Sequence, residues 1–398
     1  MPSIFIALFS AKIFLIAFGG VQLIVNALIL FCLILISFAT KKTKYLTGMF
    51  SNTEFCFILI LFSISCIASI MSGYDLKRLL EYSLKYYSII IFYSAAMYLV
   101  SKVHFRKLIS YIVAAGFLHC LIAIILYVVG FGEVIHGYVR PSGIARTNNI
   151  LAGIAAATFI ISTNEIVNGS MLNGLTKKLY IFTSAVAIIC VAISGSLTKL
   201  LTLAIFAILL FLSIRLISHK AIIFKTIYLV GGILVAMLLA SFGLLDRLTN
   251  IVDDLFLNGF NIDPTQNSFY WRLVHWQLLM EDFHSNLYNL FGMSPGGYVR
   301  LNGFVLEKTG ETFNTHNDFL LLYLEFGIII FFYLLIKVVT YLLSSTNFVG
   351  GKRIVFLSLS LISLFSPTIL SLSFVVFIIP YFSIKENLDK LKCRVPSD

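Results

Sequence analysis

Long apolar stretches separated by short polar segments run through almost the whole chain. Most of them approach the length of about 20 residues that an α-helix needs to cross a bilayer. The pattern therefore predicts an all-α, polytopic membrane protein with about 12 transmembrane helices. The expected spans are residues 3–19, 21–39, 55–71, 81–100, 108–130, 148–163, 179–194, 200–217, 226–244, 317–337, 354–366 and 368–384.

Residues 245–316 form the one long polar segment, and part of this loop has a helical pattern. Both tryptophans of the chain lie in it, which argues against a structureless linker. Residues 268–283 are predicted to form an amphipathic helix, because large apolar side chains recur at spacings of four and three. These are Phe269, Leu273, Trp276, Met280 and Phe283. We expect this helix to lie at the membrane–water boundary, with tryptophan at the headgroups.

The composition supports a membrane protein and excludes several other classes. Hydrophobic residues make up 59% of the chain and charged residues 12%, whereas about a quarter of the residues in a soluble domain are charged. Too little polar surface remains to cover the chain in water. Soluble domains, disorder, coiled coils and nucleic-acid binding are therefore excluded for the chain as a whole. In a membrane protein, the net charge of +11 is better explained by basic residues that set the topology.

The basic clusters orient the predicted spans. With about 12 spans, all the clusters fall on one side, which the positive-inside rule makes cytoplasmic. They are Lys41, Lys42 and Lys44; Lys102, Arg106 and Lys107; Lys177 and Lys178; Arg215, Lys220 and Lys225; Lys337, Lys352 and Arg353; and Lys385, Lys390, Lys392 and Arg394. The chain then divides into residues 1–244 with nine spans, the large outer loop 245–316, and residues 317–398 with three spans and a cytoplasmic tail.

Arginine dominates the basic residues on the outer side. These arginines are Arg78, Arg140, Arg146, Arg247, Arg272 and Arg300. Topology requires only positive charge, but the planar guanidinium also binds phosphate through two parallel hydrogen bonds. The bias predicts an anionic, phosphate-bearing ligand on this side. Chance, or anchoring to lipid headgroups, is the alternative explanation.

Three further outer segments carry candidate chemistry. Lys199 follows a short turn between two spans and is either a headgroup anchor or part of a phosphate site. The glycine-rich residues 290–298 form either an ordinary turn or one that lets the backbone approach a ligand. His316 and Asn317 stand at the mouth of the tenth span, where the histidine is either a helix cap or a general base. No cysteine pair has metal-ligand spacing, and no nucleotide-binding motif is present.

The order of these motifs resembles the O-antigen ligase and O-antigen polymerase superfamily of bacterial envelope glycosyltransferases. The similarity covers roughly residues 140–340. The motifs are Arg-Thr-Asn-Asn before a span, Ser-Gly-Ser at a hairpin of spans, Trp-Arg-x-x-x-Trp and Gly-x-x-Pro-Gly-Gly in the loop, then His-Asn-Asp-x-Leu and Glu-Phe-Gly. One departure is Ser196-Leu197-Thr198-Lys199, where the family often has Ser-Arg-Thr; Lys199 one turn away is expected to supply the charge.

The resemblance implies a multi-pass protein of the bacterial inner membrane, with a fold like that of the C-type membrane glycosyltransferases. It implies transfer of a glycan from undecaprenyl diphosphate on the periplasmic side, without metal or cofactor. In-line attack by the acceptor hydroxyl would invert the anomeric centre. Arg272 and His316 take the catalytic positions. The expected substrate-binding residues are Arg140, Arg146, Lys199, Arg247, Arg300 and Asn317. The implied partners are the lipid-linked oligosaccharide donor, a lipid-linked or lipid A-core acceptor glycan, and a chain-length regulator protein.

Several functions remain open at this point. A polymerase, which passes the glycan to a lipid-linked repeat unit, is favoured by the richness in Ile, Phe, Lys, Asn and Tyr. The alternatives are a ligase that uses lipid A-core and a related transferase that glycosylates protein. A flippase or other transporter is the rival from a different class. Transporters place charges within spans and often contain repeated halves, whereas here the polar residues gather in one outer loop.

Overall fold

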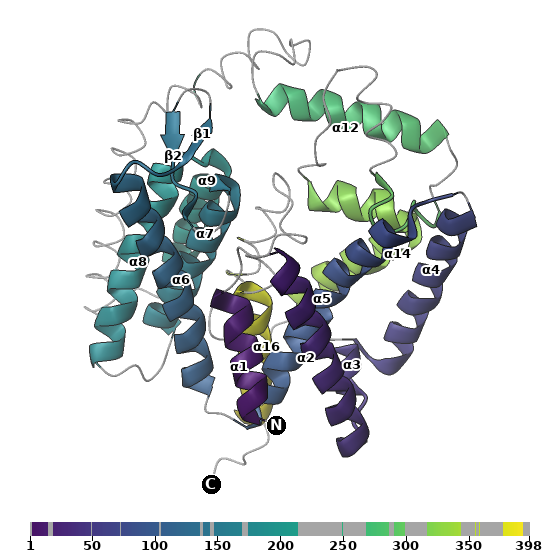
Figure 1. The fold of residues 1–398 in the computed structure, drawn as a ribbon, viewed down its shortest axis with the longest axis horizontal. Coiled ribbons are helices and arrows are strands. Elements are labelled where there is room, and N and C mark those ends of the chain that lie inside the picture. The colour runs from purple at the N-terminus through teal and green to yellow at the C-terminus, as the bar shows by residue number, and fades with distance from the viewer. Residues whose placement is uncertain are drawn as a thin grey trace.

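A computed structural model describes residues 2–14, 19–48, 50–71, 73–102, 105–135, 138–143, 147–168, 174–213, 268–285, 290–298, 317–343 and 377–392, together with residues 249, 355 and 358. Helices dominate these residues (Figure 1). They are α1 (Pro2–Phe14), α2 (Gly19–Thr40), α3 (Lys44–Thr47), α4 (Asn52–Met71), α5 (Leu76–Val100), α6 (Phe105–Val128), α7 (Asn148–Asn168), α8 (Gly174–Ser194), α9 (Leu197–Ser213), α12 (Ser268–Ser285), α14 (Asp318–Leu343) and α16 (Ile379–Lys392).

Six of the described helices are long and apolar enough to cross a membrane. These candidate spans are Asn52–Met71, Leu76–Val100, Arg106–Val128, Asn148–Val167, Gly174–Ser194 and Asp318–Thr340. Shorter apolar helices, Ile24–Thr40 and Thr198–Phe211, coincide with two more predicted spans. The helical membrane fold is therefore confirmed. The larger predicted number stays a prediction, since span 226–244 and most of spans 354–366 and 368–384 lie outside the described residues.

A short β-hairpin is the departure from the expected all-helical fold. Strands β1 (Glu133–Ile135) and β2 (Tyr138–Arg140) pair antiparallel, with Glu133 opposite Arg140. The two strands contain β-branched and aromatic residues, which favour strands. Each strand is too short to show the alternation of apolar and polar residues that predicts a strand from sequence. The hairpin connects α6 to α7 and places Arg140 at its end.

Most of the described helices form three groups (Figure 1). Helices α6, α7, α8 and α9 pack together, α1, α2, α5 and α16 occupy the middle, and α4 lies beside α14 (Figure 1). Helix α12 lies across one end of the molecule, opposite the start of α1. Close packing in the first group depends on small side chains. A methyl group on Gly116 of α6 would come within 1.9 Å of Oγ1 of Thr158 on α7.

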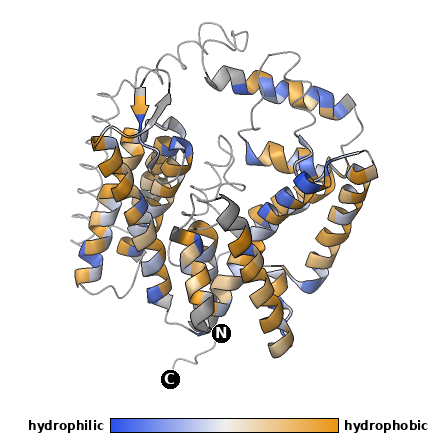
Figure 2. Cartoon of the chain, viewed as in Figure 1, coloured by the Kyte–Doolittle hydropathy of each residue, from blue (hydrophilic) through white to orange (hydrophobic). Residues whose placement is uncertain are grey.

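Hydrophobic residues make up most of the long helices (Figure 2), and many of their large apolar side chains are exposed. On α2 and α4, for example, Phe38 is 78% exposed and Ile60 is 60% exposed. In water such faces would drive aggregation, whereas in lipid they match the solvent. Apolar residues therefore occupy two places, the interior of the bundle and the surface that meets the bilayer.

Polar contacts join helices that are far apart in the sequence. The hydroxyl of Tyr381 on α16 donates to Oε1 of Glu165 on α7 over 2.6 Å and accepts a hydrogen bond from Nδ2 of Asn164, also over 2.6 Å. Lys385 pairs with the same carboxylate oxygen at 2.5 Å. A buried charge is tolerated when it is paired and hydrogen-bonded in this way. The network fixes the position of α16 against α7.

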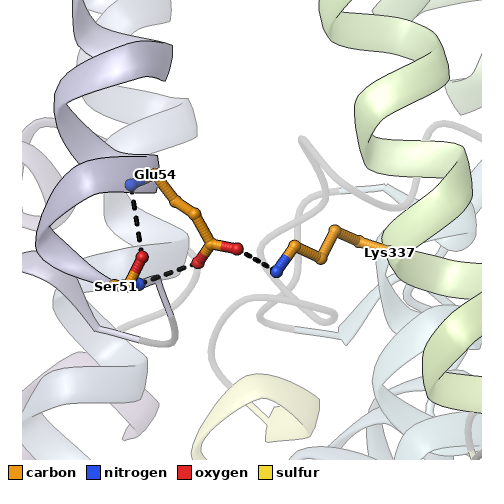
Figure 3. A network of polar contacts seen from close by, with 3 residues as sticks. All are labelled: Ser51, Glu54 and Lys337. Atoms are coloured by element: carbon orange, nitrogen blue, oxygen red, sulfur yellow. Dashed lines mark hydrogen bonds and ion pairs between the residues drawn. The ribbon is translucent and has the colours of Figure 1, made fainter.

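A second polar contact joins the start of α4 to the C-terminal half of α14 (Figure 3). Ser51 and Glu54 form a capping box at the start of α4: the N–H of Glu54 donates to Oγ of Ser51, and the N–H of Ser51 donates to Oε2 of Glu54. The other carboxylate oxygen pairs with Lys337 of α14. Both charged side chains are partly exposed, so the pair orients α14 more than it stabilises the fold.

Candidate active site

Helix α14 is broken within its N-terminal half, and this break organises the site. Gly327 has φ 69° and ψ 179°, which is incompatible with an α-helix. Backbone carbonyls before the break accept hydrogen bonds from a separate segment, which we term the glycine turn (residues 290–298). The N–H of Met293 donates to the carbonyl of Leu324, and that of Ser294 donates to the carbonyl of Glu325, both over 2.9 Å.

Glycines make this backbone contact possible on both sides. A Cβ at Gly292, where φ is 73°, would lie 2.4 Å from the carbonyl oxygen of Glu325. A Cβ at Gly327 would lie 2.4 Å from the carbonyl oxygen of Leu290. Both positions also require a backbone conformation that side chains disfavour. The close approach expected of the glycine-rich residues is therefore an approach to α14.

We expect Gly327→Ala to destabilise the protein more than Gly73→Ala. Gly73 also has a positive φ, of 77°, but no atom lies within 4 Å of its hypothetical Cβ. The control therefore has only the conformational strain, about 1–2 kcal/mol, whereas the Gly327 variant also has a steric clash of about 1–3 kcal/mol. Thermal unfolding of the purified variants in detergent measures the difference. Equal melting temperatures would contradict the importance of the contact.

The side chain of Glu325 completes the attachment of the glycine turn. It is fully buried. Its Oε1 accepts the N–H of Gly296 over 2.7 Å, and its Oε2 accepts the hydroxyl of Tyr86 on α5 over 2.5 Å. From α4, the hydroxyl of Ser69 donates to the carbonyl of Met293 over 2.9 Å. Three helices, α4, α5 and α14, therefore fix the position of the glycine turn.

Tyr298 closes the glycine turn. Its hydroxyl lies 3.4 Å from that of Tyr82 on α5. Burial, followed by this hydrogen bond, raises the pKa of the Tyr298 phenol above its ordinary value. The group therefore stays neutral and acts as a hydrogen-bonding contact between the turn and α5.

Helix α12 packs onto the glycine turn through its apolar face. Residues 268–283 were predicted to be helical, and the observed helix Ser268–Ser285 confirms this. Leu279 and Phe283 are fully buried, in one hydrophobic cluster with Met293, Tyr298, Leu321 and Leu324.

The packing face of α12 is displaced from the predicted stripe. His275, Leu279 and Phe283, spaced by four, are its most buried residues, whereas Leu273, Trp276 and Met280 are only half-buried. The spacing of apolar residues does not separate a face that packs against protein from one that meets lipid, since both are apolar. Contact with lipid headgroups at Trp276 stays a prediction.

Arg272 lies on the same face of α12, one turn before His275. Its side chain is half-buried, and desolvation lowers the pKa of the guanidinium below its ordinary value. Lys199, at the start of α9, is 4% exposed and interacts electrostatically with both Arg272 and Asp318. Asp318 is fully buried at the start of α14. The fold thus brings Lys199, Arg272 and Asp318 into one polar cluster from three separate helices.

Arg140 and Asn148 lie around the turn between α8 and α9. A Cβ at Gly195 would be 3.6 Å from Cζ of Arg140, so the guanidinium lies against this turn. Nδ2 of Asn148 donates to the carbonyl of Ser194 over 2.8 Å. Arg140 therefore lies against the turn that leads into the first residues of α9, where Lys199 lies.

Asn317 has a structural contact. Its Oδ1 accepts the N–H of Leu320 over 3.0 Å, the arrangement of an N-cap for α14. Asn317 therefore caps α14, and its role in substrate binding stays a prediction. The other predicted site residues lie outside the described part of the chain. They are His316, Arg146, Arg247 and Arg300.

The polar cluster suits an anionic ligand. Burial disfavours the protonated form of Lys199, Asp318 partly offsets this effect, and repulsion from Arg272 adds to it. Bringing like charges together out of water costs free energy, which an anion bound between them would recover. Guanidinium and ammonium groups together supply several donors to phosphate oxygens. Among the described residues, no three His, Cys, Asp or Glu side chains are grouped as metal ligands.

Glu325 and Tyr86 were not predicted as site residues. They are separated by 239 positions in the sequence, so no local pattern connects them. One signal was present: an acidic residue inside an apolar span is costly and usually has a specific role. Its neighbour Gly327, in the middle of a helix, was a second signal.

These elements define an α-helical, multi-pass membrane protein with a buried cationic cluster beside a broken helix. Residues 182–335 match the family model described as O-antigen ligase. This confirms the resemblance to the O-antigen ligase and polymerase superfamily, whose members are glycosyltransferase-like enzymes of O-antigen pathways. The matched segment contains α9, α12 and the first part of α14, which carry the polar cluster. No curated protein matches the chain.

Proposed function

We propose that this protein is an O-antigen polymerase of the bacterial inner membrane. It transfers a glycan from undecaprenyl diphosphate to the sugar of a second lipid-linked repeat unit, on the periplasmic face. The observation that carries the proposal is the polar cluster: Arg272 and Lys199 come from separate helices within the matched segment and share one poorly solvated place.

The chemistry of the transfer requires such a cluster. As the bond between the sugar and its leaving oxygen breaks, negative charge develops on the diphosphate. Donors held in a poorly solvated site stabilise that charge without a metal ion. The acceptor is a sugar hydroxyl, and His316 is the base that removes its proton. In-line attack inverts the anomeric centre.

The position of the site fits amphiphilic substrates. Helix α12 lies across the end of the bundle opposite the start of α1 (Figure 1). This arrangement supports the topology derived from the basic clusters, in which the N-terminus is cytoplasmic and the large loop periplasmic. Both substrates then keep their lipid in the bilayer and present their sugars at the boundary.

A ligase is the second candidate, because the matching family model is described as O-antigen ligase. The two functions use the same donor and the same leaving group and differ in the acceptor. The polar cluster therefore serves either reaction.

Deletion in the native host, followed by gel analysis of lipopolysaccharide, tests the proposal. Loss of a polymerase leaves core carrying a single repeat unit. Loss of a ligase leaves bare core while lipid-linked polymer accumulates. Bare core without lipid-linked polymer indicates a flippase, and an unchanged polymer ladder contradicts all three functions.

A further inference from the structure

Helix α12 packs directly on Leu321 and Leu324 of α14, and a second part of its attachment runs through the glycine turn and the buried carboxylate of Glu325. Helix α12 carries Arg272 and packs through Leu279 and Phe283 onto Met293 and Tyr298 of the glycine turn. The glycine turn is held at the break of α14. There, Glu325 accepts one hydrogen bond from the glycine turn and one from α5. Displacement of the turn would therefore displace the helix that carries the arginine.

From this geometry, we infer that Glu325 is a positioning residue for the transfer reaction, which acts through the glycine turn and α12 to place Arg272. The inference rests on the proposed function for its activity readout. Glu325 belongs neither to the polar cluster nor to the set of residues assigned to proton transfer or phosphate binding.

The hydrogen bonds of Glu325 suit this role. Its two carboxylate oxygens have different partners, the N–H of Gly296 at 2.7 Å and the hydroxyl of Tyr86 at 2.5 Å. Its own backbone carbonyl accepts the N–H of Ser294 over 2.9 Å. One residue thus holds the turn at two points and joins it to α5. Oriented donors must be held closely for catalysis, and a misplacement of about 1 Å costs about 10²-fold in rate.

Glutamine and alanine at position 325 separate positioning from proton chemistry. Glutamine has nearly the same shape: its oxygen accepts from Gly296 and its amide donates to the oxygen of Tyr86. We expect Glu325→Gln to retain transfer activity within a few-fold of the unaltered protein. We expect Glu325→Ala to lose about 10²-fold at matched amounts of folded protein. Tyr86→Phe, which removes one hydrogen bond only, is the milder variant and should lie between them.

Trp276 on α12 provides a readout that is independent of activity. The chain has two tryptophans, so Trp271→Phe leaves Trp276 as the single fluorophore. In full-length protein in detergent, acrylamide quenching of Trp276 should increase in Glu325→Ala and in Tyr86→Phe, but not in Glu325→Gln. The matched control is Glu54→Gln, which removes a carboxylate contact at the other end of α14 and should leave quenching unchanged.

The outcomes divide clearly. Glu325→Gln as inactive as Glu325→Ala, with quenching unchanged in both, would overturn the inference and assign the carboxyl group to the chemistry. Unaltered activity and quenching in Glu325→Ala would also overturn it. Absence of glycan transfer even in the unaltered protein contradicts the proposed function, and in that case the difference in quenching between alanine and glutamine still tests the positioning.

Discussion

Replacement of Arg272 by lysine will remove most of the transfer activity, and replacement by alanine will abolish it. A guanidinium binds two diphosphate oxygens at once, whereas an ammonium is a single point charge. Loss of one donor to a developing oxyanion costs about 10²–10³-fold in rate. Because Arg272 is partly desolvated beside Lys199, its interaction with the leaving group is screened little by water. Polymer length on gels, and transfer rates at matched protein levels, measure the effect.

The alternative role for Arg272 is an anchor to lipid headgroups, in which lysine would serve equally well. Arg78 provides the matched control, because it lies on the same predicted side but its side chain is 55% exposed and pairs with Asp75 at the start of α5. We expect Arg78→Lys to leave transfer unchanged. Near-normal polymer from Arg272→Lys would reject the phosphate-binding role.

Replacement of His316 by alanine is expected to lower the transfer rate by about 10²–10⁴-fold, the contribution of a positioned general base. The sequence places His316 two residues before Asp318 of the polar cluster and at the end of the loop that contains Arg272. In the proposed mechanism, a neutral imidazole at this position would accept the proton of the attacking hydroxyl. The variant should remain folded and inserted, so transfer with purified substrates is the appropriate assay.

His284 is the better of two control histidines. It is exposed on α12, 3.4 Å from the hydroxyl of Tyr323, so alanine there should cost little. His275 is 1% exposed on the packing face of α12, and its removal also disturbs packing. If His316 only capped α14, His316→Asn would restore activity. The side-chain oxygen of Asn317 already has that role, because it accepts a hydrogen bond from the N–H of Leu320. Full polymer length in His316→Asn would leave the base assignment without support.

The amino-acid sequence by itself determined the class of the protein and much of its helical layout. Apolar length and charge predicted helices that the structure places at α4, α5, α6, α7, α8 and α14. The amphipathic pattern located α12 to within a few residues. These features depend on neighbours within one helix, which is why periodicity reveals them. The order of the motifs indicated the superfamily. The chemistry of arginine and lysine made Arg272 and Lys199 candidates for phosphate binding.

Only the tertiary structure decided how these parts meet. The glycines at 292 and 327 were visible as glycines, but their contact depends on two backbones approaching closely across separate segments. The pairing of Glu325 with Tyr86, and the gathering of Lys199, Arg272 and Asp318, likewise join segments that share no local pattern. The direction of the packing face of α12 was also undetermined, since lipid and protein interior select the same apolar residues. These contacts are set by packing between segments that are distant in the sequence, and the pattern of hydropathy along the chain does not predict which segments meet.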